Sequence, residues 1–304
     1  MVGESQFAIG IESFKSDFDP DSDPDSDSDF RLRRVRRNIM PMSAEFENRL
    51  YPVLPEIAAH YGTPFHIYDE VGIRATGQAF IDGFAGLDGF QEFYAVKALP
   101  NPEILKIMSS MGFGFDCSSV AELALCRQIG ARPEQLMFTS NNTSPAEFEV
   151  ALADGGCILN LDDISLLDKV PELPELLCFR YNPGPRRTGN NIIGNPVEAK
   201  YGVAFEQLEE AYRNARDRGV KRFGLHTMVA SNSLLLESFG ETARLLFEIV
   251  VEVKQKWDIK IEFINMGGGV GIPYKLEEEP IDFTELSRVI KEQYDTIIVK
   301  NGLD

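Results

Sequence analysis

The feature of this sequence that most limits its fold is a regular alternation of apolar, β-type segments with stretches of helical periodicity. Seven segments have the composition of buried strands, and these are residues 92–97, 113–116, 136–140, 157–161, 176–181, 222–228 and 260–265. Helical patterns lie between them or after them, at residues 102–111, 119–130, 145–154, 205–218, 236–256 and 282–299. The early strands recur about every 20–23 residues, which is a natural length for one βα unit.

Segments that are apolar on both faces are typical of parallel strands covered by helices. Repeated βα units of this size indicate a (β/α)8 barrel or a doubly wound sheet. We count seven strands, and the sequence stops just after the helical pattern at 282–299. The predicted fold class is therefore α/β, a (β/α)8 TIM-type barrel that is incomplete, with about seven of its eight units. Such an open barrel would leave two long apolar edges unpaired.

The first part of the chain has a different composition. Residues 17–29 read DFDPDSDPDSDSD, and five arginines follow within residues 31–37. Because such a segment cannot bury a core, we expect residues 1–42 to be a disordered tail. The tail is either an interaction segment or an extension upstream of a start at Met40 or Met42. Residues 43–70 are predicted to hold a helix at 44–61 and a short strand at 65–68, and residues 71–304 the barrel.

The composition argues against several classes of protein. The formal net charge of -18 argues against nucleic-acid binding, which needs a basic face. No apolar run approaches the roughly 20 residues of a membrane span. The four cysteines form no CxxC pair and there are only three histidines, so we expect no metal site. Reduced thiols and the lack of an apolar signal segment favour a cytoplasmic protein.

In a (β/α)8 barrel, chemistry is carried by residues at the carboxyl ends of the strands. Lys97 ends the first predicted strand in the pentapeptide YAVKA. A lysine that is partly desolvated and close to other cations loses its proton near neutral pH, and the neutral amine attacks carbonyl groups. This is the property needed to hold pyridoxal phosphate (PLP) as a Schiff base. The alternative is an ordinary solvated lysine.

The run Gly267-Gly268-Gly269 follows the seventh predicted strand. Glycines allow successive backbone N–H groups to converge on an anion without Cβ clashes. Late loops of barrels also often bind phosphate. We therefore interpret the run as a candidate phosphate site, with a flexible turn as the alternative.

Six motifs occur in order along residues 45–304, and they are YAVKA, GFGFDCSSVAEL, RYNPG, KYGV, GLHTMVASN and GGGVGIPY. Together they resemble the fold-type III PLP-dependent decarboxylases, which have the alanine racemase-like barrel. RYNPG and GGGVGIPY are most similar to the diaminopimelate decarboxylase branch. The FDCSS run would also fit the ornithine and arginine decarboxylase branch.

The resemblance implies roles for particular residues. Lys97 would form the Schiff base, and Arg180 would reach the same cofactor site. The other implied cofactor contacts are Asp116, Glu122, His226, Met228, Ser231, Gly267, Gly268 and Gly269. Two simpler interpretations stay open, because Asp116 and Glu122 are also typical of a helix start and Arg180 could merely pair with a carboxylate.

The chain departs from the family pattern at two places. Met228 occupies the position of a histidine that usually stacks on the cofactor, and Ala230 replaces a glycine. The family also continues with an eighth strand and a C-terminal β-domain, neither of which is present, and the resemblance implies that residues 43–70 are the N-terminal helix and strand of that β-domain. We therefore expect a fragment of an enzyme of roughly 400 residues or more, inactive or very weak alone, whose full-length form is a homodimer.

The resemblance implies decarboxylation of meso-diaminopimelate to L-lysine, with an amino acid as the small-molecule substrate. The open alternatives are decarboxylation of another basic amino acid, such as D- or L-ornithine or lysine, and a non-catalytic PLP-binding barrel. A phosphate-binding barrel without PLP is a third alternative.

Overall fold

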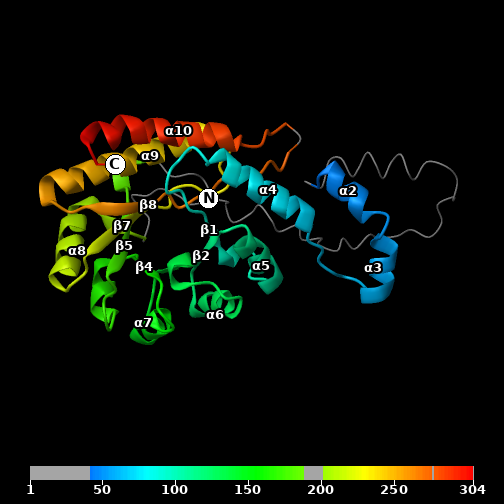
Figure 1. Cartoon of the computed structure of the whole chain (residues 1–304), viewed down its shortest axis with the longest axis horizontal. Helices are drawn as coiled ribbons and strands as arrows, with labels where there is room; N and C mark the ends of the chain where they lie inside the picture. Colours follow the sequence, from blue (N-terminus) through cyan, green and yellow to red (C-terminus); the bar gives the residue numbers. More distant parts are fainter. Residues whose placement is uncertain (1–41, 188–200, 276, 304) are drawn as a thin grey trace.

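The computed structural model describes residues 42–187, 201–275 and 277–303, so most of the predicted tail lies outside the described residues. Seven parallel strands form a curled, incomplete barrel in the order β1-β2-β3-β4-β5-β7-β8 (Figure 1). The strands are β1 (Phe93–Ala95), β2 (Gly114–Cys117), β3 (Leu136–Ser140), β4 (Ile158–Leu161), β5 (Leu176–Asn182), β7 (Arg222–His226) and β8 (Ile261–Asn265). A two-residue strand, β6 (Val203–Ala204), pairs with β5 outside this order. The predicted α/β class and its seven parallel strands are confirmed.

Helices follow most strands and cover the outside of the sheet. They are α2 (Ala44–Leu50), α3 (Leu54–Tyr61), α4 (Glu70–Gly83), α5 (Pro102–Ser110), α6 (Val120–Gln128), α7 (Pro145–Leu152), α8 (Phe205–Asp217), α9 (Leu236–Trp257) and α10 (Phe283–Ile297). In Figure 1, α9 and α10 run together along one side, while α5, α6 and α7 lie outside β1 to β4. Helices α2 and α3 stand away from the barrel. None of the described helices is both long enough and apolar enough to cross a membrane.

Local sequence explains where the barrel helices begin. The N-cap of α7 is Ser144, whose hydroxyl accepts from the Glu147 N–H, while the Glu147 carboxylate accepts from the Ser144 N–H at 2.8 Å. This reciprocal capping satisfies two N–H groups that a helix start otherwise leaves unpaired. Ser119 caps α6 and Asp282 caps α10 in a related way. These helix starts fix the direction in which the chain leaves each strand.

The core between sheet and helices is aromatic on the side of β5 and β7. The ring of Tyr212 packs edge-on against Phe179 and Phe223, and its hydroxyl donates to the Gly224 carbonyl at 2.9 Å. A Cβ at Gly224 would lie 2.2 Å from the Phe263 ring. Only glycine therefore allows β7 and β8 to pack with this ring between them.

The two ends of the sheet, β1 and β8, have no further strand beside them among the described residues. Helices hold this seam together instead, because α4 packs against α10. Phe80 on α4 contacts Phe283 on α10 with ring centroids 5.0 Å apart, and a Cβ at Gly83 would meet Phe283 at 2.8 Å. The trough beside the seam is lined by apolar side chains, which include Phe84, Leu87, Phe90, Phe93, Val250, Ile261, Phe263 and Ile290, and also by polar ones, which include Gln91, Glu92, Lys260, Glu262, Lys291 and Asp295.

Some predicted boundaries are wrong. The helix predicted at 44–61 is two helices, α2 and α3. Pro55 is tolerated only in the first turn of a helix, so a new helix starts there and the chain is broken before it. Residues 65–68 belong to no strand, since no described segment lies alongside to pair their backbone groups. Strand β1 ends at Ala95, so Lys97 lies in a short 3-10 turn, Val96–Ala98. The assignment of residues 43–70 to a β-domain stays a prediction.

Candidate functional site

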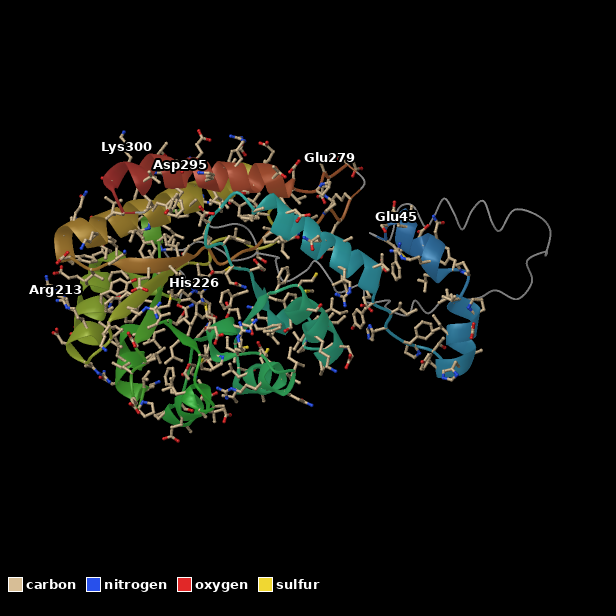
Figure 2. The ribbon with its side chains drawn as sticks, viewed as in Figure 1. Glu45, Arg213, His226, Glu279, Asp295 and Lys300 are labelled. Atoms are coloured by element: carbon tan, nitrogen blue, oxygen red, sulfur yellow. The ribbon has the colours of Figure 1, made fainter. Side chains whose placement is uncertain are left out.

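The carboxyl ends of the strands surround a cavity of about 1660 Å³, which continues into the trough between β1 and β8. Figure 2 shows His226 inside the fold, among the strands. Nine of the ten predicted site residues line this cavity, and they are Lys97, Asp116, Arg180, His226, Met228, Ser231, Gly267, Gly268 and Gly269. The structure therefore brings together residues separated by up to 172 positions from Lys97 to Gly269.

Lys97 lies just beyond β1, in the turn Val96–Ala98, and its side chain is exposed at the cavity. The positive charge of Lys97 lowers the pKa of Asp116, and it also lowers that of His226. Its charge therefore influences two groups that line the same cavity. An accessible amine in a turn just after a strand can form a covalent bond with a carbonyl compound that enters.

Asp116 on β2 is half-buried, and its Oδ1 atom is buried without a hydrogen-bond partner in the described structure. Burial raises the pKa of Asp116 to about 6. A hydrogen bond with Thr139 and the charges of Lys97 and Arg180 act in the opposite direction. Asp116 therefore offers a carboxylate oxygen to a ligand and is protonated more readily than an exposed aspartate.

Glu122 is not among the residues that line the cavity, and its predicted contact with the cofactor stays a prediction. Its Oε2 atom accepts from the Ser118 N–H at 2.8 Å and its Oε1 from the Ser119 hydroxyl at 3.0 Å. Both carboxylate oxygens are therefore used to fix the start of α6. The simpler interpretation of Glu122, as a first-turn carboxylate, describes these contacts.

Arg180 on β5 takes part in two contacts within the cavity wall. Its Nη1 atom donates to Asp162 Oδ1 at 3.1 Å, and its guanidinium carbon lies 5.1 Å from the centroid of the Tyr201 ring. Both charged side chains are largely buried. Arg180 does pair with a barrel carboxylate, and it also lines the cavity, while its contact with a cofactor stays a prediction.

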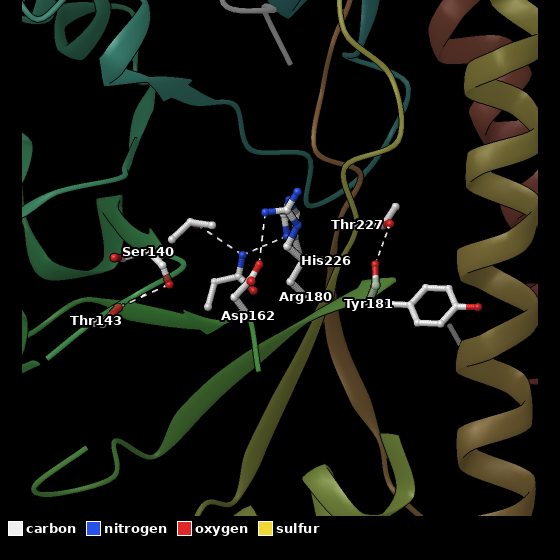
Figure 3. Close-up of polar contacts among 9 residues, drawn as sticks. Ser140, Thr143, Asp162, Arg180, Tyr181, His226 and Thr227 are labelled. Atoms are coloured by element: carbon white, nitrogen blue, oxygen red, sulfur yellow. Dashed lines mark hydrogen bonds and ion pairs between the residues drawn. The ribbon is translucent and has the colours of Figure 1, made fainter. Parts of the chain in front are cut away.

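His226 at the end of β7 is buried, with only 4% of its surface exposed. Its Nδ1 atom lies 2.9 Å from the amide nitrogen of Asn160 on β4 (Figure 3). Burial, followed by the charges of Arg180 and Lys97, holds the pKa of His226 well below its ordinary value. The imidazole is therefore neutral at physiological pH.

The glycine run forms a tight cradle beside the loop that follows β7. Gly267, Gly268 and Gly269 have φ angles of 80°, 90° and 88°, a region that side chains disfavour. A Cβ at Gly267 would lie 2.1 Å from the Thr227 carbonyl oxygen, and one at Gly269 would lie 2.2 Å from the Ala230 carbonyl oxygen. Among the described residues, neither Gly268 nor Gly269 donates its N–H to a protein acceptor. Such N–H groups are suited to an anion.

Sequence reasoning missed several polar residues that line the cavity or contact its lining, and four of them lie beside the predicted site residues. These are Thr139, Asn160, Asp162 and Tyr201. A signal was present for one of them, since Asn160 is the single polar residue in the apolar run CILNL. A buried amide in such a run indicates a specific partner, because an unpaired one is costly.

Comparison with known proteins decides the family. The family described as "Pyridoxal-dependent decarboxylase, pyridoxal binding domain" matches residues 74–303. The chain belongs to this family. The cofactor expected for a pyridoxal-dependent decarboxylase is PLP, in agreement with the prediction from the motifs.

Individual relatives show how far the match extends. Protein TabA of Pseudomonas amygdali pv. tabaci is 40% identical over 252 residues, which are 83% of this chain and 60% of that protein. Diaminopimelate decarboxylase of Methanothermobacter thermautotrophicus is 35% identical over 82% of this chain and 59% of its own length. The crystal structure of diaminopimelate decarboxylase from M. jannaschii with L-lysine has a TM-score of 0.71 and 25% identity, over 80% of this chain and 60% of that one. The chain thus spans about 60% of the length of these relatives.

The residues present fit PLP. The glycine cradle, closed to any side chain at Gly267 and Gly269, presents unpaired N–H groups of the kind that hold a phosphate. The unpartnered Oδ1 atom of Asp116 lies in the same cavity as the Lys97 amine. A phosphate site, an amine and a buried carboxylate are the groups that a phosphorylated aldehyde cofactor requires.

Proposed function

We propose that this chain is the PLP-binding part of an amino-acid decarboxylase. The observation that carries the proposal is the convergence of Lys97, Asp116, Arg180 and the glycine cradle 267–269 on one cavity. When bound, PLP supplies an electron sink for the carbanion that loss of carbon dioxide leaves behind. The chain itself supplies binding, orientation and charge.

Each residue has a role that follows from its place. Lys97 is the amine that attaches the cofactor aldehyde, since it is exposed at the cavity and near Asp116. The N–H groups of Gly268 and Gly269, together with Ser231, bind the phosphate. Arg180, fixed by Asp162, provides a positive charge for a carboxylate or a ring oxygen. Met228 packs on one face of the ring, because a thioether interacts favourably with aromatic surfaces.

We propose meso-diaminopimelate as the substrate and L-lysine as the product. This choice is supported by relatives named diaminopimelate decarboxylase, such as those of Methanothermobacter thermautotrophicus at 35% and Thermoplasma acidophilum at 30% identity. The 40% identity to TabA keeps another amino-acid substrate open. Ornithine or lysine, and a PLP barrel without catalysis, remain the alternatives. For the active enzyme we also propose a cytoplasmic homodimer.

Activity of the 304-residue chain alone should be weak. The cavity that holds the predicted site continues into the trough beside the seam, and β1 and β8 have no further partner strand in the described structure. A site open along one wall admits water and holds its ligands loosely. We therefore expect cofactor binding to be easier to detect than turnover.

The first test is covalent capture of PLP. We expect the purified chain with PLP to develop a visible absorbance band, and borohydride reduction should leave the cofactor attached to Lys97 in a mass-mapped peptide. Lys97→Ala should lose both signals. Lys106→Ala is the matched control, because Lys106 is exposed and pairs with Glu103 at 2.7 Å on α5. Absence of any band in a folded sample would refute PLP binding.

The second test identifies the substrate by measuring release of carbon dioxide. The 304-residue chain, and a longer form of the protein extended to the length of its relatives, would be given diaminopimelate, ornithine and lysine. Release of carbon dioxide only from diaminopimelate supports the proposal. Release only from another amino acid would identify that amino acid as the substrate instead. PLP attachment without release from any of them by the longer form would favour the non-catalytic barrel.

A further inference from the structure

A row of buried hydrogen bonds crosses the inside of the sheet at the bottom of the cavity. The side-chain nitrogen of Asn160 on β4 lies 3.2 Å from the Thr139 hydroxyl on β3 and 2.9 Å from Nδ1 of His226 on β7. Figure 3 marks the contact at His226 with a dashed line. Asn160 is only 1% exposed. The proposed function so far assigns no role to Asn160.

The chemistry of the groups gives these bonds a direction. An amide nitrogen carries two hydrogens and only donates, so the Thr139 oxygen and the His226 Nδ1 atom are both acceptors. Asn160 therefore donates to the Thr139 hydroxyl oxygen, and Thr139 keeps its own proton for another acceptor.

The direction of the hydrogen bond from Asn160 also determines which ring nitrogen of His226 carries the proton. If Nδ1 of a neutral imidazole accepts a hydrogen bond, its proton is on Nε2. Nε2 of His226 has no protein partner in the described structure, and the ring lines the cavity. A second proton on the ring is disfavoured, because burial opposes a further charge and because Arg180 and Lys97 are both positively charged.

We propose that Asn160 is a positioning residue that holds His226 as the Nε2–H tautomer, with this N–H available to an anionic oxygen of the ligand in the cavity. A neutral N–H donor binds a carboxylate, phenolate or phosphate oxygen without adding charge beside Arg180 and Lys97. The identity of the ligand depends on the proposed function, whereas the tautomer of His226 depends only on the contacts of the Asn160 side chain with Thr139 and His226.

A purely structural role for Asn160 explains less. Its Oδ1 atom is buried without a hydrogen-bond partner in the described structure. Burying a carbonyl oxygen without a hydrogen-bond partner is unfavourable, because it loses its bonds to water. Asn160 thus stabilises the fold less than a well-packed apolar residue of similar size would. What it does provide is a nitrogen that two acceptors share.

The tautomer can be read directly by nitrogen-15 NMR of labelled histidine, on the whole chain without cofactor. The chain has only three histidines, and the other two, His60 and His66, are exposed and serve as internal references. We expect His226 to show an unprotonated Nδ1 and a protonated Nε2. A protonated Nδ1 in the unaltered chain would overturn the proposal.

Two variants test whether Asn160 is the cause. Asn160→Asp replaces the donor by an isosteric acceptor, so His226 should move its proton to Nδ1 or become doubly protonated. Asn142→Asp makes the same change at an exposed position and should leave the His226 signals unchanged. A folded Asn160→Asp variant with the unaltered tautomer would refute the role of Asn160. If Asn160→Asp does not fold, Asn160→Ala replaces it and should show both tautomers; an unchanged single tautomer would again refute the role.

Cofactor affinity gives a second, separable result. We expect Asn160→Asp to weaken PLP binding about tenfold, which is the effect of losing roughly 1.4 kcal/mol, while Asn142→Asp binds normally. Unchanged PLP affinity despite a changed tautomer would overturn the link between His226 and the ligand. Failure of the unaltered chain to bind PLP would refute the proposed function but leave the tautomer result standing.

Discussion

Arg180 and Asp162 form an ion pair inside the barrel wall, with the Arg180 Nη1 and Asp162 Oδ1 atoms 3.1 Å apart (Figure 3). The Arg180 side chain is 14% exposed and that of Asp162 is 5% exposed. Burial raises the pKa of Asp162, and the charge and hydrogen bond of Arg180 oppose this. The arginine is thus held in the cavity by a carboxylate that would be costly to leave alone.

We predict that Arg180→Ala lowers the free energy of unfolding by about 3–5 kcal/mol, because it leaves Asp162 buried and unpaired. Urea unfolding checks this value. The cost should be smaller in acid, where Asp162 can become protonated. Arg218→Ala is the matched control, since its pair with Asp168 has a similar distance of 3.0 Å but is exposed. Its removal should cost less than about 1 kcal/mol, and equal losses in the two variants would contradict the prediction.

For Asp116 we expect the opposite effect on stability. Removing its buried charge should raise the free energy of unfolding of the protein without cofactor. Burial raises its pKa from 3.8 to about 6, so the folded protein binds this proton more tightly than the unfolded chain. The ionised Asp116 therefore lowers the free energy of unfolding. This effect is absent below about pH 4, grows as the pH rises, and is complete above about pH 6. At neutral pH it is about 3 kcal/mol at most.

Asp116→Asn should therefore raise the free energy of unfolding at neutral pH by up to about 3 kcal/mol, and the gain should disappear near pH 4. Thermal or urea unfolding over this pH range measures the difference from the unaltered protein. The exposed Asp217 provides the control, because Asp217→Asn on the surface should leave the free energy of unfolding at neutral pH nearly unchanged. The same Asp116→Asn variant should bind PLP more weakly, and a destabilised variant at neutral pH would count against the argument.

The order of secondary-structure elements in the barrel could be predicted because each strand is a local apolar run bounded by turn residues. Helix α4 was missed because Gly72 and Gly77 weaken its helical pattern. Strand β6 has only two residues, which are too few to show the residue pattern by which strands are predicted from sequence. The seam between α4 and α10 joins Phe80 to Phe283, a contact that no local pattern encodes.

The site was predictable where chemistry follows directly from residue type and position. Lys97 and the glycine run could be found in this way, because a strand end and a triple glycine are both visible in the sequence. The contact between Asn160 and His226 joins residues 66 positions apart, so only the folded sheet reveals it. The role of Glu122 depends on which groups its oxygens contact, and sequence alone left both possibilities open.

The glycine cradle should not tolerate a side chain. A Cβ at Gly267 would lie 2.1 Å from a carbonyl oxygen, and its φ angle is 80°. We predict that Gly267→Ala lowers the free energy of unfolding by about 3 kcal/mol through overpacking and backbone strain, and abolishes PLP binding. Gly302→Ala separates these effects, since Gly302 has a φ of 65° but nothing within 4 Å of the added Cβ. This control should cost only about 1 kcal/mol and retain PLP affinity.

Glu122 should act through the start of α6 and not through the cofactor. Because its two oxygens accept from Ser118 and Ser119, Glu122→Ala should lower the free energy of unfolding by about 1 kcal/mol. Glu122→Gln keeps one good acceptor and should cost about half as much. Titration with PLP should give similar affinities for both folded variants and the unaltered chain. If the charge of Glu122 instead acted on the cofactor, Glu122→Gln would lose affinity about as strongly as Glu122→Ala while remaining nearly as stable as the unaltered protein.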